Sequence, residues 1–88
     1  MEYKLSFSKT ALKNLLKISV NKRKAILEKL EQLKLNPYPY KENNNIKKLI
    51  GQDGYRLRIG DYRVIYRTDK GKLEILVINV DVRGEVYK

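Results

Sequence analysis

The fold is decided by one stretch of the chain, Tyr55-Arg56-Leu57-Arg58-Ile59-Gly60-Asp61-Tyr62-Arg63-Val64-Ile65-Tyr66-Arg67. Bulky apolar side chains and charged side chains alternate with a period of two on both sides of Gly60 and Asp61. This pattern predicts two antiparallel β-strands joined by a two-residue turn. In that register Ile59 faces Tyr62, and the pairs that follow are Arg58 with Arg63, Leu57 with Val64, Arg56 with Ile65 and Tyr55 with Tyr66.

The register sorts the side chains of this hairpin onto two faces. The face predicted to join the core carries Tyr55, Leu57, Ile59, Tyr62, Val64 and Tyr66. The opposite face carries Arg56, Arg58, Arg63 and Arg67, with only Ile65 among them. Like charges opposite each other destabilise a sheet by up to about 1 kcal/mol per pair, whereas guanidinium groups match phosphate oxygens well. The arrangement therefore predicts an anion-binding face. The alternative is a solvated basic face, partly neutralised by Asp53, Asp61 or Asp69.

Two further strands are predicted, one on each side of the hairpin in sequence. Residues 73–80 are nearly all apolar and β-branched apart from Glu74 and Asn79, which is typical of a central strand covered on both faces. The N-terminal residues alternate between apolar and polar, which predicts a short first strand carrying Tyr3, Leu5 and Phe7.

Two helices are predicted between the first strand and the hairpin. Ser8 is the expected N-cap of the first helix and Asn21 that of the second, which Pro37 prevents from continuing. The inward faces are expected to carry Leu12, Leu15 and Leu16 on the first helix, and Ile26, Leu30 and Leu33 on the second. The lysines of this antiparallel helix pair are expected to face solvent, namely Lys13, Lys17, Lys22, Lys24 and Lys29.

Residues 37–51 have many turn-forming residues and little periodicity, which predicts an ordered loop over the sheet, held at its end by Ile46, Leu49 and Ile50. The predicted element order is thus β-α-α-β-β-β. This order defines an α+β fold, with the helices packed on one face of a mainly antiparallel sheet. We expect a single domain that spans residues 1–88.

Composition excludes several kinds of chemistry. The 88 residues include neither cysteine nor histidine, so disulfides, thiolate metal sites and histidine-dependent catalysis are excluded, and no cofactor or metal is expected. Twenty Lys and Arg against ten Asp and Glu give a formal charge of +10, which favours a polyanion or an acidic protein as partner. The N-terminus has no apolar run of the kind found in signal peptides, so we expect a cytoplasmic protein with no membrane association.

The C-terminus contains a second unusual pair, Arg83 and Tyr87. If the last strand lies beside the hairpin, Arg83 emerges close to the arginines and Tyr87 can fold back toward them. Guanidinium groups favour the ionised form of a nearby phenol, which would then act as a base. The alternative is that Tyr87 only packs the end of the chain.

These two motifs, residues 55–66 and Arg83-Gly84-Glu85-Val86-Tyr87, resemble those of the RelE/ParE superfamily of toxin–antitoxin toxins, and the resemblance covers the whole chain. It implies the RelE-like fold and a cytoplasmic toxin held inactive by a cognate RelB-like antitoxin. RelE-like members are ribosome-dependent endoribonucleases. They cleave mRNA in the ribosomal A site without metal, by attack of the ribose 2′-hydroxyl on the adjacent phosphate.

The resemblance also implies which residues form the site. The expected catalytic residues are Arg56, Arg58, Arg63, Arg83 and Tyr87. The expected additional RNA contacts are Arg67, Lys47 and Lys48. The arginines would bind the scissile phosphate and stabilise the transition state, and Tyr87 would accept the 2′-hydroxyl proton or stack on a base. RelE has lysines at the positions of Arg56 and Arg58, and many relatives have histidine where this chain has Val82, so the acid and base roles stay open.

Two other functions are compatible with the resemblance. ParE-like members share the fold but poison DNA gyrase through protein contacts, without catalysis. A toxin that has lost its activity would serve only as a partner of the antitoxin, binding operator DNA through the antitoxin complex.

Overall fold

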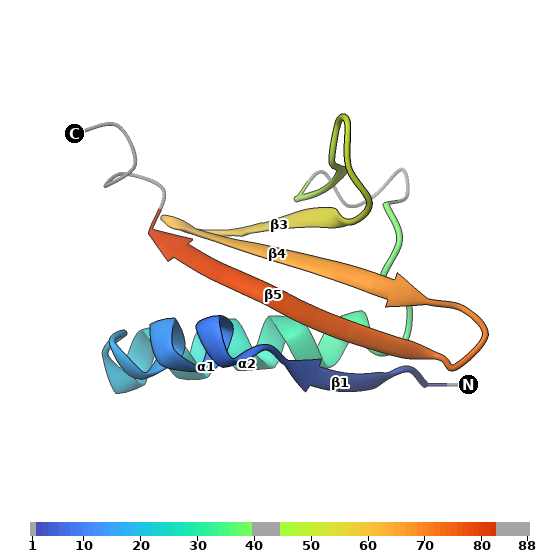
Figure 1. Ribbon diagram of the computed structural model, residues 1–88. Helices are drawn as coiled ribbons and strands as arrows, with labels where there is room; N and C mark the ends of the chain where they lie inside the picture. Colours follow the sequence, from blue (N-terminus) through green and yellow to red (C-terminus); the bar gives the residue numbers. More distant parts are fainter. Residues whose placement is uncertain (1, 40–44, 83–88) are drawn as a thin grey trace.

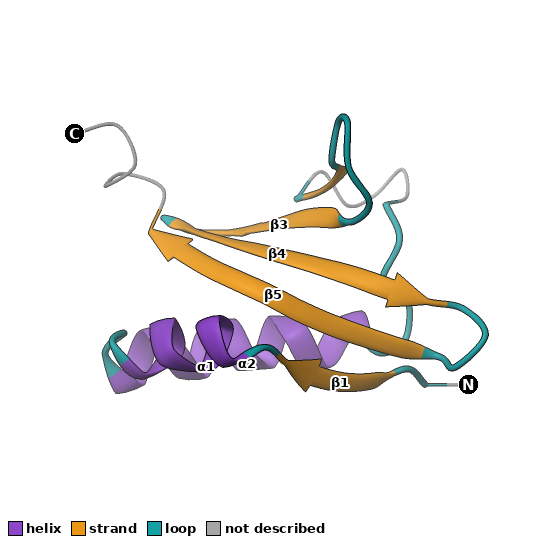
Figure 2. Cartoon of the chain, in the orientation of Figure 1, coloured by secondary structure: helices purple, strands orange, loops and turns teal. Residues whose placement is uncertain are grey.

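The computed structural model describes residues 2–39 and 45–82 of the chain (Figure 1). The elements are β1 (Lys4–Phe7), α1 (Lys9–Leu16), α2 (Val20–Leu33), β2 (Ile46–Lys48), β3 (Tyr55–Ile59), β4 (Tyr62–Asp69) and β5 (Glu74–Val82). In these ranges the strands form one five-stranded sheet in the order β1-β5-β4-β3-β2. Figure 2 shows both helices on one side of this sheet. The predicted α+β architecture is confirmed.

The last strand, β5, lies inside the sheet as predicted. It pairs antiparallel with β4 and parallel with β1, so the sheet is mixed although mainly antiparallel. Ile75, Val77 and Val80 are buried on the helix side, but Leu76 keeps 39% of its surface exposed on the other side. The prediction that both faces of this strand are covered is therefore wrong. Both helices lie on the same side, and an apolar run does not by itself reveal how many of its faces are buried.

Helix α1 begins as predicted but turns a different face inward. The Ser8 hydroxyl accepts a hydrogen bond from Ala11 N at 3.0 Å and donates one to Ile78 O at 2.7 Å. Ala11 and Leu15 are buried, whereas Leu12 and Leu16 are 48% and 71% exposed. The predicted inward face was wrong for these two leucines. The small side chain of Ala11 lies against the sheet, so the buried face of the helix is the one that carries Ala11 and Leu15.

Helix α2 begins at Val20, so Asn21 lies inside the helix and the predicted N-cap is wrong. The connection between the helices is held instead by Arg23. Its guanidinium donates to the carbonyls of Leu15 and Ile18, each at 2.9 Å, and of Leu16 at 3.3 Å. The predicted inward face is confirmed, because Ile26, Leu30 and Leu33 are buried, and the helix ends at Leu33 before Pro37. The five helix lysines predicted to face solvent are exposed.

The segment predicted to be a loop contains the short edge strand β2. Ile46 is buried and pairs with Leu57, which confirms it as a core contact, but Ile50 is 97% exposed and makes no such contact. Three residues are too few to reveal a strand period. The turn after β2 depends on Gly54, where φ is 123° and a Cβ atom would lie 2.8 Å from the backbone oxygen of Tyr66.

Tyrosine side chains connect the segment after α2 to the sheet. The hydroxyl of the fully buried Tyr66 donates to Pro37 O at 2.6 Å, and its ring stacks on Tyr55 with centroids 5.7 Å apart. The Tyr38 ring meets Tyr55 edge to face at 5.6 Å. Burial, followed by the nearby Tyr55 and Tyr38, raises the pKa of Tyr66 well above its ordinary value. Tyr66 therefore stays neutral and serves the core, as its place in the predicted register indicated.

Candidate nucleic-acid interface

The predicted register of the hairpin is confirmed. Arg58 pairs with Arg63 and Leu57 with Val64, and the other three pairs also match. Leu57 and Val64 are buried toward the helices. Because side chains alternate along a strand, the arginines lie on the opposite side of the sheet, which we call the outer face. The turn itself uses Gly60 at a φ of 56°, a conformation that favours glycine.

Two rows of paired residues cross the outer face. In the first row, Arg58 of β3 pairs with Arg63 of β4, which pairs with Asp81 of β5. In the second row, Lys47 of β2 pairs with Arg56, which pairs with Ile65. Together with Arg67, the basic residues of these rows form a cluster that we call the arginine face, consisting of Lys47, Arg56, Arg58, Arg63 and Arg67.

The charges of the arginine face are not neutralised within the described residues. The only ion pair found in residues 2–39 and 45–82 joins Lys34 Nζ to Glu31 Oε2 at 2.8 Å, far along the sequence from the arginines. Asp53, Asp61 and Asp69, the predicted neutralising residues, form no ion pair there. Asp69 Oδ1 instead accepts a hydrogen bond from Lys72 N at 3.1 Å. The arginine face is therefore a concentration of positive charge open to an anion.

Two of the arginines also have an unsatisfied buried atom. Arg56 and Arg63 are half-buried, and the Nε atom of each is buried with no hydrogen-bond partner in the described part of the chain. Leaving a buried donor without a partner costs about 1–3 kcal/mol, and more for a charged group. An anion bound to the terminal nitrogens of these two guanidinium groups would offset part of that cost by stabilising their charge. Arg58 and Arg67 are exposed and available from solvent.

The structure brings together most, but not all, of the predicted site residues. Lys47 joins Arg56, Arg58, Arg63 and Arg67 on the outer face. Lys48 pairs with Tyr55, so alternation places it on the helix side, apart from this cluster, and its predicted contact with RNA stays a prediction. Arg83 and Tyr87, the remaining predicted residues, lie outside the described residues.

Sequence reasoning missed Asp81, because the face of the sheet on which this residue lies depends on a bulge in β5. Tyr66 pairs with Val77 and Ile65 with Asn79, so Ile78 has no partner of its own and the alternation shifts by one residue. Strict alternation from Val77 would send Asp81 into the core. The bulge instead buries Val80 and pairs Asp81 with Arg63 on the outer face. The available signal was that Asn79 and Asp81 are polar while Val80 between them is apolar.

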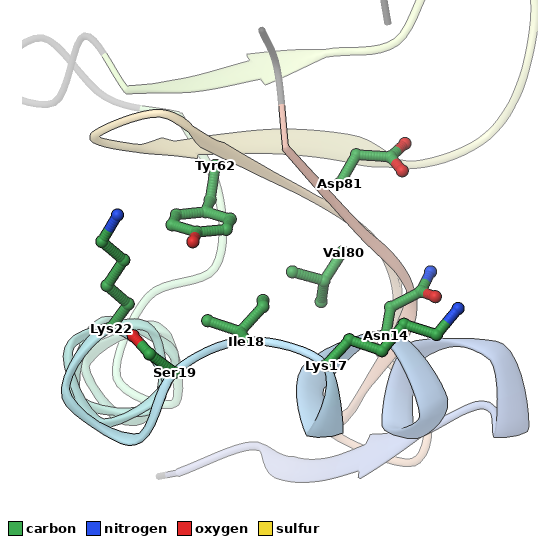
Figure 3. A pocket seen from close by; sticks show the side chains of 8 residues that line it. All are labelled: Asn14, Lys17, Ile18, Ser19, Lys22, Tyr62, Val80 and Asp81. Atoms are coloured by element: carbon green, nitrogen blue, oxygen red, sulfur yellow. The ribbon is translucent and has the colours of Figure 1, made fainter. Parts of the chain in front are cut away.

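A cavity of about 460 Å³ lies beside Asp81, between the α1–α2 connection and the end of the sheet (Figure 3). Tyr62 and Val80 point into it toward the helices, while Asp81 points away from the helices. Lys22 Nζ lies 5.8 Å from the centre of the Tyr62 ring. The cavity borders the arginine face at Asp81, without being part of it.

Neither helix in the described ranges has the length and apolar character needed to cross a bilayer.

The mixed five-stranded sheet, the helix pair on one side and the basic outer face define a small toxin fold. The chain belongs to the RelE/ParE superfamily, because residues 5–87 match the family model of the ParE toxin of type II toxin–antitoxin systems. It is therefore a toxin of such a system.

Individual relatives agree with this assignment. The chain is 36% identical to the protein named RelE1 of Methanocaldococcus jannaschii, over 100% of this chain and 98% of that protein. Among solved structures, the archaeal RelE–RelB complex from Pyrococcus horikoshii matches with a TM-score of 0.80 and 31% identity, covering 96% of this chain and 98% of that one. The intact Escherichia coli RelBE complex matches with a TM-score of 0.74 and 30% identity, over 89% and 93% of the two chains.

Proposed function

We propose that this toxin is a ribosome-dependent endoribonuclease that cleaves mRNA in the ribosomal A site without metal, by attack of a ribose 2′-hydroxyl on the adjacent phosphate. The observation that carries the proposal is the arginine face, in which Arg56 and Arg63 have buried Nε atoms with no hydrogen-bond partner among the described residues. The likeness to RelE proteins over nearly the whole chain supports it as well.

In this mechanism the arginines bind the scissile phosphate. Arg56 and Arg63, held half-buried, supply fixed donors to the charge that builds up on the phosphoryl oxygens in the transition state. Arg58 adds charge from an exposed position, and Arg83 would contribute a further guanidinium. Tyr87 would stack on a base or take part in proton transfer. A guanidinium itself cannot carry the proton, because it is not deprotonated in proteins.

The distribution of charge on the outer face limits where RNA can lie. The end near Gly60 carries the Arg58–Arg63 pair, whereas the far end of the same two strands carries Asp69 of β4 paired with Glu74 of β5. Glu74 also pairs with Lys4, so the carboxylates at the far end are partly offset, and the guanidinium pair near Gly60 attracts a phosphate backbone more strongly. We therefore expect the scissile phosphate to lie over Arg56, Arg58 and Arg63, near the Gly60 turn.

The test is 5′-end mapping of a reporter mRNA incubated with purified, antitoxin-free toxin, in the presence and absence of ribosomes. We expect cuts confined to ribosome-occupied codons and unaffected by a chelator. Arg56→Gln should reduce cleavage by about 100-fold or more, since one preorganised donor to a developing oxyanion contributes 10²–10³ in rate.

Lys29→Gln is the matched control, because it removes one positive charge from an exposed position of α2. Melting temperatures of both variants show that the fold is retained. Equal losses in the two variants would mean that net charge, and not the arginine face, governs cleavage.

A second candidate is poisoning of DNA gyrase through protein contacts, since the family model that matches carries the ParE description. Intact mRNA together with a DNA-damage response on expression would favour this function over RNA cleavage. Lack of any toxicity would indicate a toxin that has lost its activity.

We further propose a cytoplasmic location and a cognate RelB-like antitoxin as partner, because the similar solved toxins are found in complexes with RelB. The net charge of +10 calls for an antitoxin that is acidic where it makes contact. Operator DNA would be bound through that complex.

A further inference from the structure

Asp81 is the one acidic residue in the row of paired residues that contains Arg58 and Arg63. It lies directly opposite Arg63 in the β4–β5 pairing. Side chains paired in this way have Cβ atoms about 4.5–5.5 Å apart and point to the same side of the sheet. The β5 bulge at Ile78 is what brings the carboxylate to the outer face, so its position depends on a specific feature of the backbone.

The carboxylate is held from one side only. Asn14 Nδ2 of α1 donates to Asn79 Oδ1 at 2.7 Å, and Asn79 Nδ2 donates to Asp81 Oδ2 at 3.3 Å. Within the described ranges no second hydrogen bond and no ion pair reaches Asp81, although Arg63 is its neighbour. One oxygen is therefore positioned by the two asparagines, and the other is available to a ligand on the outer face.

Among the described residues, the other charged groups that share the row of Asp81 or line the adjacent cavity are cations. Arg63 of β4 and Arg58 of β3 share its row, while Lys17 of α1 and Lys22 of α2 line the cavity at the same edge, together with the neutral Tyr62. The chain has no histidine, and on the arginine face the described side chains are guanidinium groups and the ammonium of Lys47. Asp81 thus places a carboxylate in the same row as Arg58 and Arg63, and a carboxylate accepts a proton where a guanidinium cannot.

We propose that Asp81 is the general base of the RNA cleavage reaction, a role that rests on the proposed function. Its carboxylate takes the proton of the ribose 2′-hydroxyl, and the oxygen's electron pair forms the new bond to phosphorus. The bond from phosphorus to the 5′-oxygen breaks, and that oxygen keeps the bonding pair and takes a proton from water. The products are a 2′,3′-cyclic phosphate and a 5′-hydroxyl end, and Asp81 returns its proton to solvent.

The test compares Asp81→Asn with Asp61→Asn. Each change removes one negative charge, and Asp61 lies exposed in the hairpin turn beside the same arginines. The measurement is single-turnover cleavage on programmed ribosomes at saturating toxin, as a function of pH, with RNA affinity measured separately.

We expect Asp81→Asn to lower the cleavage rate by about 10²–10⁴-fold, the usual contribution of a general base, while RNA binding is unchanged or tighter. The rise of the wild-type rate with pH on the acidic side should disappear in this variant. Asp61→Asn should retain both the rate and the pH profile, and Asp81→Glu should recover part of the rate.

If Asp81 served only as a counter-charge, Asp81→Asn would not lower the cleavage rate. Removing a negative charge beside bound phosphate strengthens binding and would leave or raise that rate. Wild-type-like cleavage with an unchanged pH profile in Asp81→Asn would therefore overturn the proposal and leave the proposed function intact. The same conclusion would follow if the rise of the rate with pH on the acidic side were lost in Tyr87→Phe and kept in Asp81→Asn. No cleavage by the wild-type toxin would overturn both. Melting temperature and antitoxin binding verify that each variant is folded.

Discussion

At the residue scale, the arginine face is made of side chains that oppose folding. Arg58 and Arg63 repel each other across the hairpin, and Arg56 and Arg63 each bury an Nε atom that has no hydrogen-bond partner in residues 2–39 and 45–82. A sequence that served stability alone would place neutral or opposite charges here. Such local conflicts are expected where a residue serves binding instead of packing.

Tyr66 illustrates the contrasting case of a residue that serves only stability. Tyr66→Phe keeps the ring but leaves the buried carbonyl of Pro37 without its donor, so we expect the free energy of unfolding to fall by about 1–3 kcal/mol. Urea denaturation at neutral pH measures the change. Tyr55→Phe is the control, because the Tyr55 ring is half-buried in the same stack and its hydroxyl has no hydrogen bond within the described residues. Equal effects would show that the hydroxyl of Tyr66 contributes nothing.

At the element scale, the two helices are joined by hydrogen bonds and not only by apolar packing. The Arg23 guanidinium donates to three carbonyls at and just after the end of α1, those of Leu15, Leu16 and Ile18. Leu15 O also accepts a hydrogen bond from Ile18 N at 3.1 Å. Helix α1 also supplies Asn14, which donates to Asn79 beside Asp81, so α1 is bonded both to the start of α2 and to the sheet next to the arginine face.

Arg23→Gln should therefore destabilise the protein by about 1–3 kcal/mol, since carbonyls that accept from a charged donor lose it. Lys24→Gln, which removes the same charge from an exposed neighbour, should change the stability by less than about 0.5 kcal/mol. Thermal unfolding of the two variants gives the comparison. A similar shift in both would indicate a charge effect instead of the loss of these hydrogen bonds.

At the scale of the whole molecule, positive charge covers both sides of the domain. Apart from the arginine face, residues 3–27 contain no acidic residue and seven basic ones, Lys4, Lys9, Lys13, Lys17, Lys22, Arg23 and Lys24. The exposed Leu12 and Leu16 lie within this segment. An acidic partner with apolar side chains fits such a surface better than nucleic acid does. In the kind of partner it fits, this side therefore differs from the outer face.

We therefore expect Leu12→Glu combined with Leu16→Glu to weaken binding of the cognate antitoxin at least tenfold without unfolding the toxin. Each leucine buried in an interface contributes up to about 1.5–3 kcal/mol, and a glutamate would in addition repel an acidic partner. Isothermal titration calorimetry provides the affinities. Leu35→Glu, at a 72% exposed position after α2, is the control. Unchanged affinity in the double variant would place the antitoxin elsewhere.

The hairpin, the N-cap at Ser8 and the inward face of α2 could be predicted because each depends on contacts within a few residues or on one regular period. Alternation around Gly60 and Asp61 determines the faces of β3 and β4 whatever packs on them. Most of the arginine face was thus already defined by local pattern.

The remaining features depend on how the elements meet. The close approach of Ala11 to the sheet decides which leucines of α1 point inward. Strand β2 is too short to show a period of two in the sequence, and only its pairing with β3 reveals it. The face on which Asp81 lies depends on the bulge at Ile78, a residue skipped in the β4–β5 pairing and bonded through its carbonyl to the Ser8 hydroxyl. Contacts between distant parts of the chain set this register, so no local period could reveal the carboxylate beside the arginines.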